Sequence, residues 1–116
     1  MDEMTEDARR VRDLMVGLVL RPETKWRAVA GEGVAVVRWV RTLRTPRSVR
    51  NGTVSLWSQD TYPQIMTVSL VGNQASVRIR VAPWTSMVGE MVSLDRVREI
   101  LSDPETYADG VDRGMR

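Results

Sequence analysis

Apolar and polar residues alternate along the chain on both sides of Gly72-Asn73. A period of two is typical of a strand with one buried face, and a two-residue Gly-Asn turn is a frequent hairpin connection. We predict that Gln64–Val71 and Gln74–Val81 form an antiparallel hairpin whose polar face carries Arg78 and Arg80. The apolar face of this hairpin comprises Met66, Val68, Leu70, Val77, Ile79 and Val81.

Asn51-Gly52 is a second hairpin signal, because it separates Ser48–Arg50 from Thr53–Trp57. Residues 58–63 are expected to form a loop. The stretch from Trp84 to Val92 is expected to be irregular or to contain one more short strand.

Residues 25–43 fit two interpretations. As a hairpin, Lys25–Ala30 and Val34–Leu43 are strands joined by Gly31-Glu32-Gly33. As helices, a first segment begins at Pro22 and ends at Gly31, and a second one follows. The density of β-branched residues and the glycine-flanked turn favour the hairpin, although the helical interpretation stays open.

Two segments show the spacing of amphipathic helices. The first is Thr5–Leu20, with Thr5 as its N-cap. The second follows Ser93, and Asp103-Pro104-Glu105 is expected to start a short final turn that ends at Gly110. The apolar faces comprise Val11, Leu14, Met15, Leu18 and Val19 in the first helix, and Leu94, Val97, Ile100 and Leu101 in the second.

The order helix, antiparallel strands, helix predicts an α+β fold. We expect a two-layer sandwich in which an antiparallel sheet of four to five strands is flanked by N- and C-terminal helices. A length of 116 residues fits one domain, which we place at residues 1–110, with 111–116 as a disordered tail.

The chain contains no cysteine and no histidine, so Ser-His-Asp and Cys-His catalysis and the common zinc sites are excluded. Between Gly33 and Gly89 the only acidic residue is Asp60, which leaves no carboxylate pair for hydrolysis or magnesium binding in this region. We therefore predict that the protein is not an enzyme and has no catalytic residue, cofactor or metal.

The N-terminal residues are acidic, unlike those of a signal peptide, and the early apolar run Leu14–Leu20 is much shorter than the roughly 20 residues that span a bilayer. We expect a cytoplasmic protein with no membrane partner.

An arginine occupies every third position five times in succession. In a strand such arginines would alternate between the two faces, whereas in polyproline II geometry they would line one edge. Pro46 disfavours one regular strand or helix through the whole run. We expect a strand end with Arg38 and Arg41, followed by an exposed loop with Arg44, Arg47 and Arg50.

Three interpretations of this run remain open. It contacts phosphates, with Trp39 or Trp57 stacking on bases; or it meets an acidic protein through bidentate Arg–carboxylate pairs. In the third interpretation it is a solvated loop paired with the acidic helices of the same chain, and its arginines reflect a GC-rich genome, since sixteen arginines accompany the single Lys25. Our leading hypothesis is a non-enzymatic protein-interaction module, a small regulator or inhibitor from a high-GC bacterium or its phage. It would dock through its sheet face or arginine loop and could form a homodimer through a sheet edge. The alternative is a nucleic-acid-binding protein.

Overall fold

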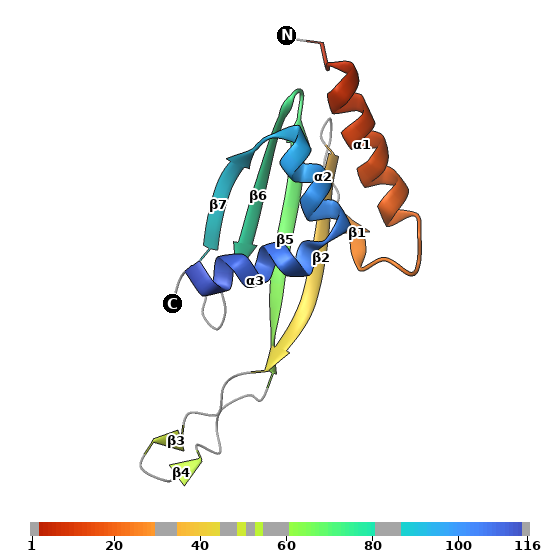
Figure 1. The fold of residues 1–116 in the computed structure, drawn as a ribbon. Helices are drawn as coiled ribbons and strands as arrows, with labels where there is room; N and C mark the ends of the chain where they lie inside the picture. Colours follow the sequence, from red (N-terminus) through yellow and green to blue (C-terminus); the bar gives the residue numbers. More distant parts are fainter. Residues whose placement is uncertain are drawn as a thin grey trace.

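The computed structural model describes residues 3–29, 35–44, 49–50, 53–54, 61–80 and 87–114. The helices form one layer and the five longer-paired strands a second layer, as Figure 1 shows. In chain order they are α1 (Glu6–Val19), β1 (Trp26–Ala28), β2 (Ala35–Arg44), β3 (Val49–Arg50), β4 (Thr53–Val54), β5 (Thr61–Val71), β6 (Gln74–Arg80), β7 (Met87–Val92), α2 (Leu94–Ser102) and α3 (Pro104–Gly114).

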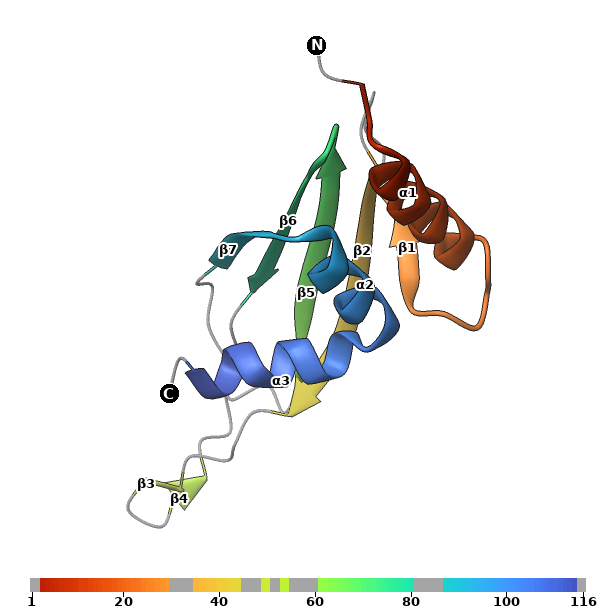
Figure 2. The same ribbon diagram turned by 45° about the horizontal axis from the view of Figure 1, so that its top comes forward.

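Five strands form one antiparallel sheet in the order β1-β2-β5-β6-β7. The three described helices lie on one side of this sheet (Figures 1 and 2). The α+β class, the antiparallel sheet and its flanking N- and C-terminal helices are therefore confirmed. A separate two-stranded sheet, β3-β4, lies beyond the end of β2.

The hairpin interpretation of residues 25–43 is confirmed. β1 pairs antiparallel with β2, and Trp26 lies directly opposite Trp39. β2 then pairs with β5 over ten residues, from Ala35 opposite Leu70 to Arg44 opposite Thr61. The predicted Gly31-Glu32-Gly33 turn lies outside the described residues.

The hairpin around Gly72-Asn73 is also confirmed, with Val71 paired to Gln74. Gly72 has a φ of 58°, which only glycine adopts without strain. The Asn73 side chain ties this turn to the start of α1: its Oδ1 accepts from the Thr5 amide at 2.6 Å, and its Nδ2 donates to the Glu3 carbonyl at 3.1 Å.

β5 begins earlier than the sequence predicted, because residues 61–63 belong to the strand rather than to a loop. Pro63 lies opposite Thr42 of β2, and the described part of β6, which ends at Arg80, provides no pairing partner for it, as is usual for a proline in a strand. Near the other hairpin, β3 and β4 pair as predicted from Asn51-Gly52, a turn that lies outside the described residues.

The helix starts follow the predicted caps. The Thr5 hydroxyl accepts from the Ala8 amide and the Ser93 hydroxyl from the Arg96 amide, each at 3.1 Å. Two details differ: Leu14 is exposed while Ala8 is buried, and α3 continues through Gly110 to Gly114 instead of ending at Gly110.

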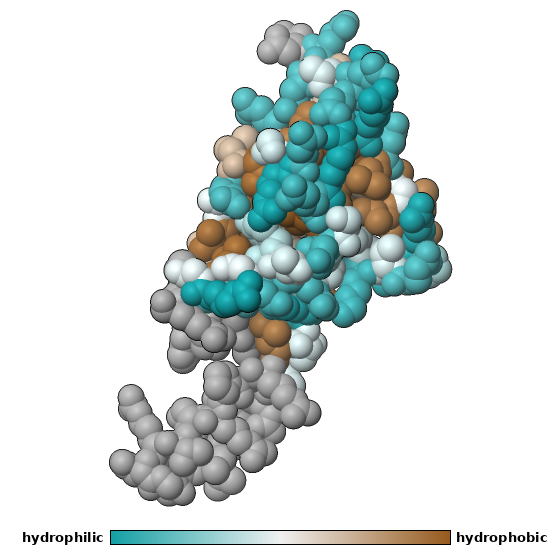
Figure 3. Space-filling view, in the orientation of Figure 1, coloured by the Kyte–Doolittle hydropathy of each residue, from teal (hydrophilic) through white to brown (hydrophobic). Residues whose placement is uncertain are grey.

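The core lies between the sheet and the helices, and the space-filling view shows the largely hydrophilic outer surface of the helical layer (Figure 3). Among the described residues, no helix is both long and apolar enough to cross a membrane. The buried core comprises Val11, Met15, Trp26, Val37, Trp39, Met66, Val68, Leu70, Ala75, Val77, Ile79, Val97, Ile100, Leu101, Tyr107 and Ala108.

Candidate interaction surface

The register of the sheet separates its side chains into two faces. Trp39, Met66 and Ile79 lie side by side on neighbouring strands and are buried, so this row faces the helices. The adjacent row must face the opposite way because successive side chains of a strand alternate. That row runs from Arg27 through Arg38, Thr67 and Arg78 to Gly89.

This second face is covered by no described helix, and its charge is of one sign. It carries Arg27 and Arg38 on adjacent strands, Arg78 farther across the sheet, and Arg80 opposite Met87. Glu90 is the one acidic residue among the described parts of the five strands, and it belongs to the other face, opposite buried Val77. We call this uncovered surface the arginine face.

The arginines of this face are largely uncommitted. Arg38 and Arg78 are exposed and make no hydrogen bond or ion pair with any described residue. Arg27 differs, because its Nη1 donates to the carbonyls of Thr24 at 2.5 Å and Trp26 at 2.8 Å. At least two guanidinium groups are thus free to bind an external anion.

Exposed apolar side chains lie beside these charges. Met87 is 47% exposed and Met91 is 64% exposed, and both belong to the arginine face through their pairing with Arg80 and Ser76. Val40, opposite Ile65, adds another exposed apolar group. The surface therefore combines cations with hydrophobic contact area.

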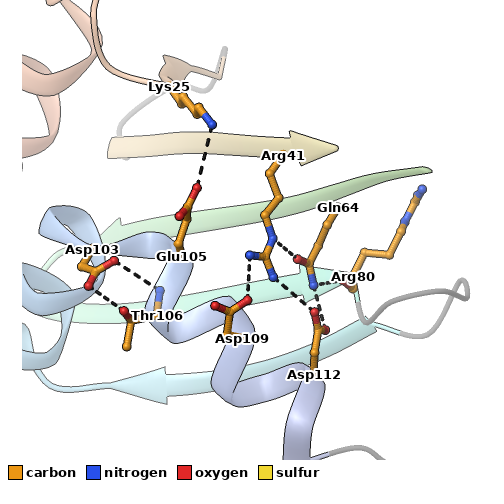
Figure 4. A network of polar contacts seen from close by, with 9 residues as sticks. All are labelled: Lys25, Arg41, Gln64, Arg80, Asp103, Glu105, Thr106, Asp109 and Asp112. Atoms are coloured by element: carbon orange, nitrogen blue, oxygen red, sulfur yellow. Dashed lines mark hydrogen bonds and ion pairs between the residues drawn. The ribbon is translucent and has the colours of Figure 1, made fainter. Parts of the chain in front are cut away.

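Arg41 has a different role from Arg38, although both belong to the predicted arginine run. It points toward the helices, is 10% exposed, and donates to Asp109 at 2.8 Å and Asp112 at 3.3 Å, both on α3 (Figure 4). Its guanidinium also lies 5.5 Å from the centre of the Trp39 ring. Arg41 is committed to holding α3 on the sheet.

Gln64 completes this buried polar cluster. Its Oε1 accepts from Nε of Arg41 at 2.7 Å, and its Nε2 donates to Asp112 at 2.9 Å and to the Arg80 carbonyl at 3.1 Å. Gln64 is fully buried, and every buried side-chain polar atom of the described residues has a partner.

The structure disperses the remaining predicted site residues. Trp39 is 2% exposed, so it is a core residue and not the exposed stacking residue expected from the sequence. Arg44 still belongs to β2 and Arg50 to β3 of the separate small sheet, while Arg47 and Trp57 lie outside the described residues. Sequence reasoning missed Arg27 as a site residue. The predicted hairpin would have identified it, because pairing its two strands places Arg27 opposite Arg38.

Tyr107 and Glu90 form a second link between α3 and the sheet. The phenol donates to the Glu90 carboxylate at 2.6 Å, and Arg96 lies 5.3 Å from the ring centre. Burial, and then the bond to Glu90, raises the pKa of Tyr107 above its ordinary value. This phenol remains protonated at neutral pH.

The helical side offers less chemistry. A cavity of about 350 Å³ opens over the indole rings of Trp26 and Trp39, with Lys25 and Glu105 3.9 Å apart at its rim. Asp103 also lines this cavity, and hydrogen bonds from the Thr106 side chain and backbone lower the pKa of its carboxyl group. Among the described residues no group of three acidic side chains is placed to hold a metal ion.

No protein-family model, curated protein or solved structure matches this chain. The candidate surface therefore rests on the geometry of its own residues.

Proposed function

We propose that this chain is a non-enzymatic interaction module that binds an acidic protein surface through the arginine face. The observation that supports this most directly is the distribution of charge over the sheet. Arg27, Arg38, Arg78 and Arg80 share the uncovered face, and no described carboxylate accompanies them. A solvated face without a binding role usually mixes both signs of charge.

The chemistry of the face favours a protein over a nucleic acid. Arginine and methionine are both enriched in protein interfaces, and a guanidinium can bind a carboxylate through two parallel hydrogen bonds. Single-stranded nucleic acid is usually held by aromatic side chains on which bases stack. No aromatic side chain described on this sheet lies on the arginine face, since Trp26 and Trp39 both point into the core.

The affinity is expected to combine two terms. Arg38 and Arg78 provide charge complementarity, which raises the association rate and fixes orientation. Met87, Met91 and Val40 provide apolar area that a charged polymer alone would not use. An acidic partner with apolar side chains between its carboxylates should thus bind more tightly than one with carboxylates alone.

This proposal can be tested with a labelled peptide of alternating glutamate and leucine, whose binding is followed by fluorescence anisotropy in a salt series. The variant Arg38→Ala/Arg78→Ala should bind at least tenfold more weakly. The variant Arg21→Ala/Arg113→Ala is the matched control, because it removes the same charge from exposed arginines outside the sheet. It should bind like the wild type.

Two results would overturn the proposal. Equal losses in both double variants would indicate attraction by net charge alone. Tighter, face-dependent binding of a single- or double-stranded oligonucleotide of matched charge, with a steep fall as salt rises, would identify a nucleic-acid-binding protein instead.

A further inference from the structure

β7 is an edge strand without the usual protection. It ends the sheet on one side, and no described segment pairs with its outer edge (Figures 1 and 2). Natural edge strands are commonly protected by lysine, proline or a bulge, and Met87–Val92 has none of these. Its one charge, Glu90, is held by Tyr107 of the same chain.

The direction of the backbone groups of β7 follows from the register. The Val29 amide donates to the Val36 carbonyl at 3.1 Å, so even-numbered residues of β2 direct their backbone groups toward β1. Because hydrogen-bonded and non-hydrogen-bonded pairs alternate in antiparallel sheets, the pattern can be carried across β5 and β6. It leaves the N–H and C=O groups of Met87, Gly89 and Met91 pointing outward.

We infer that β7 pairs with β7 of a second copy about a two-fold axis at Gly89. An axis perpendicular to the sheet keeps the arginine face on the same side in both copies. Odd-numbered residues of β7 can therefore lie opposite only odd-numbered residues of the second copy, and even-numbered opposite even-numbered. An axis at Gly89 pairs more of the outward-pointing backbone groups of β7 than an axis at any other residue of the strand. Gly89 then faces Gly89 of the second copy, Met87 faces its Met91, and each pair exchanges two backbone hydrogen bonds.

The side chains support a second copy as the occupant of this edge. Met87 and Met91, the two exposed methionines of β7, pack side by side across the axis and both stay on the arginine face. Glu90 lies opposite Val88 of the second copy and not opposite its own equivalent. The dimer joins the two arginine faces into one continuous surface. Its formation through β7 does not depend on which partner that surface binds.

A cysteine test reads the register directly, because the chain has no cysteine of its own. A Cβ added at Gly89 meets Arg78 Cγ at 3.5 Å, an ordinary contact, so Gly89→Cys should fold. Paired Cα atoms in such a ladder are about 5.5 Å apart, which suits a disulfide. Mild oxidation of Gly89→Cys should give a covalent dimer.

The control is Met87→Cys alone, which should stay monomeric after oxidation under denaturing electrophoresis. Two copies of residue 87 would be four residues apart along the paired strands, or about 13 Å. A mixture of Met87→Cys and Met91→Cys should cross-link. Equal cross-linking of every single variant, or none in Gly89→Cys, would overturn the assigned register.

Light scattering tests the dimer without cysteines. The wild type should show twice the chain mass of 13.1 kDa, and Met91→Lys should shift it toward the monomer. Val71→Lys places the same charge at another exposed apolar position on the arginine face, away from the edge, and should remain dimeric. A wild type of monomer mass throughout a concentration series would refute the proposal.

Discussion

Nε of Arg41 donates to Oε1 of Gln64 over 2.7 Å, and the two residues lie directly opposite each other on β2 and β5. The pair lies beneath α3, where Asp112 contacts both side chains. Each polar group in this cluster satisfies another that would otherwise be buried without a partner, so its members should be sensitive to isosteric change.

The variant Gln64→Glu should lower the free energy of unfolding by about 3 kcal/mol at pH 7. It replaces the Nε2 donor with an oxygen that faces Asp112 Oδ1 at 2.9 Å and the Arg80 carbonyl at 3.1 Å. Urea unfolding measures the change. Gln64→Met, which removes hydrogen bonds without adding charge, should cost less, about 2 kcal/mol. A Gln64→Glu protein as stable as the wild type would contradict the described network.

Arg38 and Arg41 should separate binding from stability. Arg41→Ala removes the cation that contacts Asp112 and the donor to Gln64 Oε1, and it should cost about 3 kcal/mol of stability. Arg38→Ala removes an exposed side chain and should change the free energy of unfolding by no more than about 0.5 kcal/mol. It should nevertheless weaken the binding of the acidic peptide. Parallel thermal unfolding and anisotropy measurements of the two variants test this. Similar profiles for both would contradict their assignment to opposite faces.

The period-two pattern at residues 64–80 predicted the hairpin and its buried face correctly, because each strand has one face toward the core and one toward solvent; Val81 lies outside the described residues. The expected strand placed Arg38 and Arg41 on opposite faces, but their roles could not be assigned because the sequence does not show which face α3 covers. The Arg41 cluster joins residues up to 71 positions apart, and no local pattern encodes such a contact. The same contact, with half-buried Val111, explains why α3 extends past Gly110.

Tyr107 should make stability depend on pH in the alkaline range. Its pKa is raised in the folded chain, so the unfolded chain loses the phenolic proton first. The stabilising term is complete below the unfolded pKa of about 10 and is lost as pH rises above it. Free energies of unfolding measured from pH 8 to 11 should fall more steeply for the wild type than for Tyr107→Phe. An identical slope for the two proteins would contradict the prediction.

Trp26 connects β1 to the end of α2, because its indole N–H donates to the Leu101 carbonyl at 3.1 Å in a buried position. This carbonyl belongs to the last turn of α2, where backbone acceptors lack partners within the helix. Trp26→Phe keeps an aromatic ring but removes the donor, and it should cost about 2 kcal/mol.

The matched control for Trp26→Phe acts on the other end of the same helix. Ser93→Ala removes the N-cap of α2 and should cost about 1 kcal/mol. Hydrogen exchange distinguishes the two, because the Val29 amide bonds to the Val36 carbonyl at the end of β1. Exchange at Val29 should accelerate in Trp26→Phe well beyond the change in Ser93→Ala. If both variants accelerate it in proportion to their lost stability, β1 is held by global folding alone and the indole bond has no local role.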